Sequence, residues 1–184
     1  MSGMLIPVVG PSGAGKDTLI DAAKEAREDI YFPPRVITRP ESSVGEEFRG
    51  VDTTFFRAMI EKEYFAFHWQ AHGLYYGISN DIISRLEAGQ DVMFNGSRGI
   101  IKEARQSFSN IRVIVITAPE SVLAKRLAAR GREDEDDIAN RLKRAAYLPP
   151  VGDDVRVIQN DVPLAQSCAK FLAALPAKRL VDSV

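Results

Sequence analysis

Short apolar runs alternate along the chain with longer segments of helical periodicity. The apolar runs lie at residues 5–9, 35–38, 91–94, 111–116 and 155–158. Buried parallel strands are continuous apolar runs, and the connections between them are usually helices. The pattern therefore predicts an α/β fold with a mainly parallel five-stranded sheet and helices on both faces.

The first helix is expected to begin near Asp17, directly after the first strand. Its apolar positions recur at helical spacing and are Leu19, Ala23, Ala26 and Ile30. Pro33 and Pro34 are expected to end it, because proline lacks the N–H that a helix interior needs. Further amphipathic helices are expected at residues 119–130, 138–146 and 164–175.

The length and composition fit one globular domain over residues 1–184. Of the 184 residues, 45% are hydrophobic and 27% are charged, which is ordinary for a globular protein. Two segments, 35–80 and 130–147, are weakly apolar and rich in charge. We expect both to be insertions that can move relative to the core.

Net charge and cysteine content narrow the possible partners and location. The formal net charge is -1, so the chain as a whole has no electrostatic attraction to nucleic acid or to a membrane surface. The only cysteine, Cys168, excludes an intrachain disulfide, and its apolar neighbours predict that it is buried. The apolar run at residues 4–9 is far shorter than a span of about 20 residues, so a cytoplasmic location is expected.

The clearest chemical signal follows the first apolar run. This segment reads Gly10-Pro11-Ser12-Gly13-Ala14-Gly15-Lys16-Asp17-Thr18 and contains the pattern Gly-x-x-x-x-Gly-Lys. Its glycines let the backbone curl so that successive N–H groups point at phosphate oxygens, and the following helix adds the positive end of its dipole. Lys16 supplies a positive charge for the β- and γ-phosphates. The segment therefore predicts a P-loop that binds ATP, the phosphoryl donor, together with Mg²⁺.

Asp17 stands where this motif usually has a Ser or Thr that binds Mg²⁺. Its carboxylate could bind Mg²⁺ directly or hold one of the metal's waters. Alternatively, it could be an acid of the first helical turn that stabilises the helix dipole. The sequence leaves both interpretations open.

Arginines gather around an acidic run at residues 133–137. They are Arg126, Arg130, Arg132, Arg141 and Arg144. Arg130 and Arg132 flank Gly131, which suits a helix end, and Arg141 falls in the next helix. These three are predicted to form a lid that stabilises charge on the transferred phosphoryl group and excludes water. For Arg126 and Arg144 we favour a solvated helical hairpin with ion pairs.

The order of the motifs resembles the guanylate kinase family over nearly the whole chain. Residues 10–18 resemble its P-loop, and Thr38-Arg39 with Gly45-Glu46 and Gly50 resemble its acceptor-binding segment. Gly73-Leu74-Tyr75-Tyr76-Gly77 resembles its Gly-Asn-Tyr-Tyr-Gly motif. Arg130-Gly131 with Arg141-Leu142 resembles its lid, and Asn160-Asp161 resembles its late Asn-Asp pair near the adenine. The resemblance implies that the segment 35–80 binds the phosphate acceptor and that 130–147 is the lid.

Several positions depart from guanylate kinases. Phe67 stands where the family has a glutamate that reads the guanine edge, and a phenyl ring cannot accept guanine N–H groups. Asn95-Gly96-Ser97-Arg98 replaces an acidic pair, the second acceptor arginine is missing from residues 41–43, and Thr53 replaces a tyrosine. These departures, together with Gly-Lys-Asp in the P-loop, resemble a narrower family, the ribose 1,5-bisphosphate phosphokinases of phosphonate catabolism.

That resemblance implies ATP-dependent phosphorylation of ribose 1,5-bisphosphate to 5-phospho-α-D-ribose 1-diphosphate. The acceptor would be a phosphate oxygen that is already ionised, so positioning and charge stabilisation are needed rather than a general base. The expected acceptor-binding residues are Arg39, Glu46, His72, Tyr76, Asn95 and Arg98. For Asn95, a tight turn after a strand is the alternative. His68 and His72 lack the further ligands of a metal site, so we expect packing for His68 and packing or a phosphate contact for His72. Phe67, Trp69 and Tyr75 are expected to be core residues rather than a platform for stacking a base.

Two other functions stay open. One is a nucleoside monophosphate kinase, which Phe67 argues against. The other is a non-catalytic guanylate kinase-like binding module, which the intact Lys16 motif argues against. The predicted partners are small molecules, ATP and a phosphorylated ribose, and the oligomeric state is left open.

Overall fold

A five-stranded parallel sheet forms the centre of the molecule. The computed structural model describes residues 2–40, 48–129 and 149–178. The sheet has the strand order β2-β7-β1-β8-β9. Its strands are β1 (Leu5–Val9), β2 (Ile30–Tyr31), β7 (Asp91–Asn95), β8 (Val113–Thr117) and β9 (Val155–Gln159). All neighbouring strands run parallel, which confirms the predicted α/β class.

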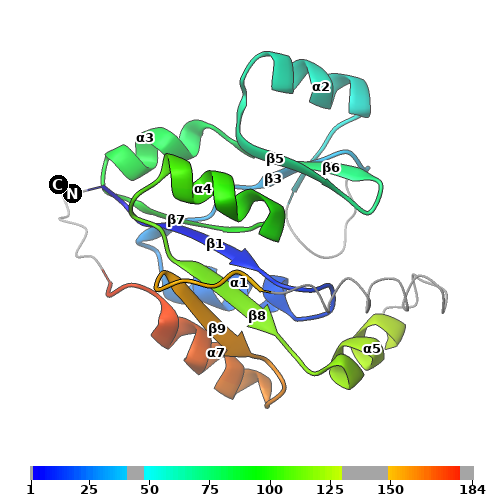
Figure 1. Cartoon of the computed structure of the whole chain (residues 1–184), viewed down its shortest axis with the longest axis vertical. Coiled ribbons are helices and arrows are strands. Elements are labelled where there is room, and N and C mark those ends of the chain that lie inside the picture. Colours follow the sequence, from blue (N-terminus) through cyan, green and yellow to red (C-terminus); the bar gives the residue numbers. More distant parts are fainter. Residues whose placement is uncertain (1, 41–47, 130–148, 179–184) are drawn as a thin grey trace.

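Helices cover both faces of this sheet, as the apolar pattern predicts (Figure 1). One face packs on α1 (Lys16–Ala26) and α7 (Leu164–Ala174), and the other on α3 (Asp81–Glu87) and α4 (Ile101–Ser107). In β1, Ile6 and Val8 belong to the first buried cluster, whereas Leu5 and Val9 belong to the second. Because successive strand residues point to opposite faces, a continuous apolar run is what a strand covered on both sides requires.

A second, four-stranded sheet lies beside the first, with the order β4-β3-β6-β5. Its elements are β3 (Arg35–Ile37), β4 (Phe48–Gly50), α2 (Thr53–Glu61), β5 (Phe65–Ala71) and β6 (Leu74–Ser79). Helix α2 covers the side away from the central sheet (Figure 1). On the other side, Phe67 and Ile78 join the same buried cluster as Val92 and Phe94 of the central sheet. The two sheets therefore share a core.

The strand expected at residues 35–38 forms, but in the second sheet. The edge strand of the central sheet is instead β2, whose Ile30 pairs with Asp91. The sequence pattern was wrong to place Ile30 in the first helix, since α1 ends at Ala26, well before the two prolines. Within the segment 35–80, which the sequence predicts to be an insertion, residues 48–50 form the short strand β4.

A buried ion pair explains why α1 stops early. Arg27, just past the helix, donates from Nε and Nη2 to the two carboxylate oxygens of Asp29, at 2.8 and 2.7 Å. Its Nη1 donates to the carbonyl of Pro176 at 2.9 Å, which ties this turn to the segment after α7. Hydrogen bonding to Asp29 raises the pKa of Arg27, so the guanidinium stays charged. These contacts fix the chain in the turn that feeds β2.

The remaining helices are α5 (Glu120–Ala129) and the single turn η1 (Arg98–Ile100). The helix expected at residues 138–146 lies outside the described residues. Cys168 is partly buried and packs against the core, close to what its apolar neighbours predict. Within the described ranges, no helix has the length and apolar character needed to cross a membrane.

Candidate phosphoryl-transfer site

The loop between β1 and α1 has the backbone of a phosphate cradle. Gly10, Gly13 and Gly15 have φ values of 149°, 81° and 89°, which L side chains rarely adopt. A side chain on Gly10 would also meet the carbonyl oxygen of Ile116. Gly15 caps α1, and the helix begins at Lys16, as the motif predicts. The curled loop therefore brings the positive end of the helix dipole to the carboxyl edge of the sheet.

Lys16 curls back over the loop. Its Nζ donates to the carbonyl oxygens of Gly10 and Pro11 at 2.9 and 3.0 Å. The ammonium group is thus held at the rim of the loop by main-chain oxygens. These contacts keep the charge beside the phosphate cradle, where a phosphate oxygen can replace a carbonyl as its acceptor.

Asn160 supports the loop from the other side. It follows β9, is buried, and donates from Nδ2 to the carbonyl of Ala14 at 2.7 Å. Its backbone N–H donates to Thr117 O at 2.7 Å, which fixes it to β8. The geometry therefore gives Asn160 a direct part in holding the P-loop, beyond the adenine contact that the resemblance implies.

Arg126 of α5 also reaches the P-loop. Its Nη1 is buried with no hydrogen-bond partner among the described residues, and it lies 3.9 Å from where a Cβ on Gly15 would be. The expectation that Arg126 is solvated was wrong for this nitrogen, whereas the ion pairs expected with residues 133–137 lie outside the described residues. The signal available was its spacing of three from the apolar Leu123, which places Arg126 beside the buried face of α5.

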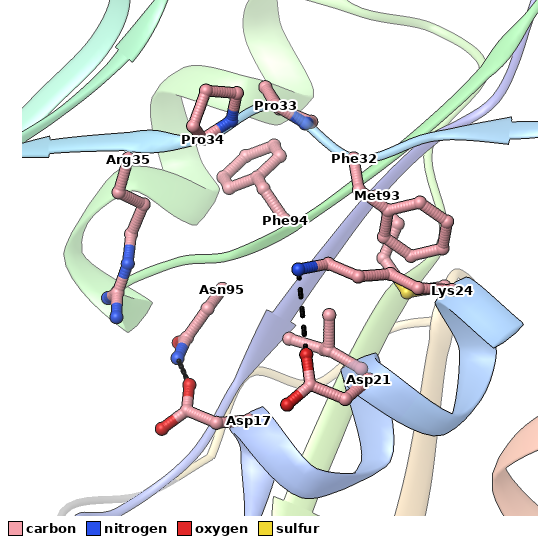
Figure 2. A pocket seen from close by; sticks show the side chains of 11 residues that line it. Asp17, Asp21, Lys24, Phe32, Pro33, Pro34, Arg35, Met93, Phe94 and Asn95 are labelled. Atoms are coloured by element: carbon pink, nitrogen blue, oxygen red, sulfur yellow. Dashed lines mark hydrogen bonds and ion pairs between the residues drawn. The ribbon is translucent and has the colours of Figure 1, made fainter. Parts of the chain in front are cut away.

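The P-loop is joined to β7 by a hydrogen bond between two side chains. Asn95, the last residue of β7, donates from Nδ2 to Asp17 Oδ1 at 2.6 Å. Figure 2 shows this bond at one end of a pocket between α1 and the residues that follow β2. The residues lining the pocket are Asp17, Ile20, Asp21, Lys24, Phe32, Pro33, Pro34, Arg35, Met93, Phe94 and Asn95. Asp17 therefore has a partner that neither interpretation of the sequence included.

Arg35 is a cation of this pocket that the sequence reasoning missed. It begins β3, and its side chain extends toward the end of the pocket where Asn95 and Asp17 lie (Figure 2). Its Cζ lies 5.5 Å from the ring centroid of Tyr76, which itself stacks on Trp69 with centroids 5.6 Å apart. A charged residue directly after two prolines, at the start of a short apolar strand, was the signal available.

Arg39 lies two residues after β3, the strand that begins with Arg35. Its guanidinium Cζ lies 4.2 Å from the ring centroid of Phe48, and its Nε is buried without a hydrogen-bond partner in the described part of the chain. The preceding Thr38 is fixed to β6, because its Oγ1 accepts from the N–H of Tyr75 at 2.9 Å. Arg39 is thus held in place by stacking and keeps a donor to offer.

Comparison with known proteins agrees with this geometry. The family model described as guanylate kinase matches residues 2–165. The chain belongs to the guanylate kinase family. Among solved structures, the guanylate kinase from Anaplasma phagocytophilum superposes with a TM-score of 0.66 at 18% identity, covering 94% of this chain and 84% of that one. At that identity the likeness shows the fold alone.

Relatives within this family carry a more specific name. The ribose 1,5-bisphosphate phosphokinase of Ruegeria sp. is 40% identical over 178 residues, which cover 96% of this chain and 94% of the relative. The bifunctional ribose 1,5-bisphosphokinase-thymidine phosphorylase of Cupriavidus necator is 43% identical over 175 residues, which cover 95% of this chain and 29% of the relative. The chain thus spans less than a third of that bifunctional relative.

Phe67 marks where this member of the guanylate kinase family differs most clearly from a guanine-binding one. Its ring is 1% exposed and stacks on Phe94 with centroids 5.8 Å apart. This confirms the prediction that Phe67 is a core residue rather than a platform for stacking a base. The position that the resemblance gives to a guanine-reading glutamate is therefore filled by a buried apolar contact between the two sheets.

The other predicted acceptor residues lie along the second sheet or just after β7. Tyr76 is on β6, and Arg98 begins η1, which Ser97 caps by accepting from the N–H of Gly99. His72 is exposed in the turn between β5 and β6, with φ of 53°. His72 is not one of the residues that line the pocket, so its acceptor role stays a prediction.

Some predicted residues cannot be placed. Glu46, Arg130, Arg132 and Arg141 lie outside the described residues, so their roles in the acceptor site and the lid stay predictions. His68 is exposed on β5, contrary to the expectation that it packs inside. Within the described ranges, no group of three or more His, Cys, Asp or Glu residues is placed to hold a metal ion.

Proposed function

We propose that this chain transfers the γ-phosphoryl group of ATP to ribose 1,5-bisphosphate and forms 5-phospho-α-D-ribose 1-diphosphate. The observation that carries the proposal is the replacement of the guanine-reading carboxylate by the buried Phe67, next to a pocket that presents an amide and a guanidinium. The names of the full-length relatives support it. The enzyme would act in the cytoplasm, and its product would serve as a ribosyl donor.

The reaction needs little covalent chemistry from the protein. An oxygen of the 1-phosphate forms a bond to the γ-phosphorus, while the bond from that phosphorus to the β–γ bridging oxygen breaks and ADP leaves. The attacking oxygen is already ionised near neutral pH, so no side chain has to remove a proton. The barrier comes from bringing like charges together, and fixed cations lower it.

The described cations divide between two sides of the site. Lys16 of the P-loop and Arg126, which reaches the loop from α5, would hold the donor phosphates. The predicted lid arginines, Arg130, Arg132 and Arg141, would close over them. Arg35, at the start of β3, and Arg39, two residues after β3, would hold the acceptor phosphates. Arg35 thereby replaces the acceptor arginine that is missing from residues 41–43.

The residues present fit a magnesium nucleotide. Asp17 Oδ1 accepts from Asn95, which leaves its second oxygen for Mg²⁺ or one of the metal's waters, and Thr18 is exposed beside it. When bound, Mg²⁺ would neutralise part of the phosphate charge. Asp17 and the nucleotide phosphates would hold the metal ion.

The proposed function is tested by an assay of ADP release with ribose 1,5-bisphosphate, GMP or no acceptor. We expect ADP release with ribose 1,5-bisphosphate to be at least about a hundred-fold faster than with GMP. The buried Phe67 offers no hydrogen-bond partner to the N–H groups of guanine, so GMP should bind poorly. Turnover on GMP alone would make the chain a nucleoside monophosphate kinase. Binding of ATP without turnover on either acceptor would favour a binding module.

Replacement of Arg35 by glutamine tests the acceptor side. The KM for ribose 1,5-bisphosphate should rise by about ten-fold or more, since a charge-assisted hydrogen bond is worth about 1.5–3 kcal/mol. The KM for ATP should change little, because Arg35 lies on the second sheet rather than in the P-loop. Arg85→Gln is the matched control. Arg85 is an exposed arginine of α3 that lies above the ring of Tyr31, and its replacement should leave both KM values unchanged. An equal rise for ATP would show that Arg35 acts on the donor or on the fold.

A further inference from the structure

Asn95 is a buried amide whose carbonyl oxygen has no hydrogen-bond partner in the part of the chain that the structure describes. The residue is 8% exposed at the end of β7, where it pairs with Val8 of β1. Its Nδ2 donates to Asp17 Oδ1 at 2.6 Å, whereas its Oδ1 is buried and has no hydrogen-bond partner among the described residues. Buried polar atoms are almost always paired, so an unpaired carbonyl oxygen beside a pocket points to a missing ligand group.

The carboxylate of Asp17 fixes which way the amide faces. An ionised carboxylate only accepts hydrogen bonds, so the amide must turn its N–H group toward Asp17 and its oxygen away. Asn95 can then offer a ligand only an acceptor. A group that donates a hydrogen bond, such as a sugar hydroxyl, satisfies it, whereas a second carbonyl oxygen or a phosphate oxygen does not.

We propose that Asn95 is a specificity-determining residue of the acceptor site, whose Oδ1 accepts a hydrogen bond from the 2- or 3-hydroxyl of the ribose ring. This inference rests on the proposed function and adds the means by which a ribose is told from a deoxyribose. Asp17 is the positioning residue that holds the amide in the required orientation. Because Oδ1 is covered by neighbouring side chains, a hydroxyl reaches it only if one of them moves. Arg35, a long side chain that lines the same pocket, would be the one to move.

The choice of asparagine follows from its two neighbours. A carboxylate at position 95 would repel Asp17 and a doubly phosphorylated sugar, and an apolar side chain would leave Asp17 and the hydroxyl without partners. An uncharged amide donates to the first and accepts from the second. The hydrogen bond between Asn95 and Asp17 links the acceptor pocket to the P-loop. ATP and the acceptor would therefore bind on opposite sides of this pair.

The inference is tested by measuring kcat/KM for wild type and Asn95→Leu with ribose 1,5-bisphosphate and its 2-deoxy and 3-deoxy analogues. Wild type should prefer the ribose compound over one analogue by about ten-fold or more, because that analogue leaves Oδ1 unpaired. Asn95→Leu should lose most of this preference. The same preference in the variant, or none in wild type, would overturn the inference.

A second variant guards against loss of folding. Asn95→Asp keeps the size of the side chain but replaces the N–H group that donates to Asp17 by an oxygen, so its kcat/KM for ribose 1,5-bisphosphate should fall about ten-fold or more. Urea unfolding of the variant shows whether the fold is kept. Asn80→Asp, at an exposed amide, should match wild type, and wild-type kcat/KM for Asn95→Asp would contradict the proposed orientation.

The assay also separates this inference from the proposed function. No turnover of ribose 1,5-bisphosphate by wild type would overturn both. Turnover of ribose 1,5-bisphosphate with equal use of both deoxy analogues would overturn the role of Asn95 alone and leave the proposed function standing.

Discussion

Replacement of Lys16 by alanine is expected to reduce phosphoryl transfer by at least about 10²–10³-fold, the size of effect seen when one preorganised donor to a developing charge is removed. The ammonium group is held at the rim of the P-loop by the carbonyls of Gly10 and Pro11, beside the place where the donor phosphates would bind. The measurement is the rate of ADP release with ribose 1,5-bisphosphate and saturating ATP.

The fold should tolerate this change. Lys16 is the first residue of α1, where alanine is a good helix former, so the urea midpoint should stay close to that of wild type. Lys102→Ala, at an exposed lysine of α4, is the control for loss of a positive charge and should keep full activity. Near-normal transfer by the Lys16 variant would mean that the loop does not hold the donor phosphates.

Replacement of Arg27 by methionine is expected to lower the free energy of unfolding by about 3–5 kcal/mol, the usual cost of removing one partner from a buried ion pair. The side chains of Arg27 and Asp29 are only 10% and 2% exposed, so the carboxylate that remains has no water to replace the guanidinium. The variant also loses the bond to the carbonyl of Pro176. Urea unfolding followed by circular dichroism measures the change.

Arg105 and Asp154 provide a matched pair with the same two-pronged geometry. Arg105 donates from Nε and Nη2 to Asp154 at 2.9 and 2.8 Å, but the two side chains are 34% and 22% exposed. Arg105→Met should therefore cost clearly less, about 1 kcal/mol, because water can solvate the remaining carboxylate. Equal losses for both variants would show that burial is not what makes the Arg27 pair important.

The P-loop and the parallel core were accessible to sequence reasoning because both depend on local patterns. A strand, a Gly-x-x-x-x-Gly-Lys segment and a helix follow one another without a gap, and each is specified by its own residues. The apolar runs likewise identified four of the five central strands. Burial on both faces makes β1 and the middle of β7 and β8 continuously apolar, whereas the edge strand β9 is mostly exposed and mixes apolar with polar residues.

The fifth strand and the second sheet could not be read in the same way. β2 has only two residues, and Ile30 continues the helical spacing of α1 by coincidence. What ends α1 is the pairing of Arg27 with Asp29, two residues along the chain, and with the carbonyl of Pro176, a contact that no local window contains. The short strand β4 forms because it pairs with β3, so its structure depends on a neighbour rather than on its own pattern.

The sequence by itself determined the kind of fold, the phosphate cradle and the positions that depart from a guanylate kinase. Only the tertiary structure decided that Arg126 reaches the P-loop, that Arg35 lines the pocket and that Asn95 bonds to Asp17. The physical reason is distance along the chain. Asp17 and Asn95 are 78 residues apart and meet because β1 and β7 are neighbours in a parallel sheet, whose carboxyl ends converge on one edge.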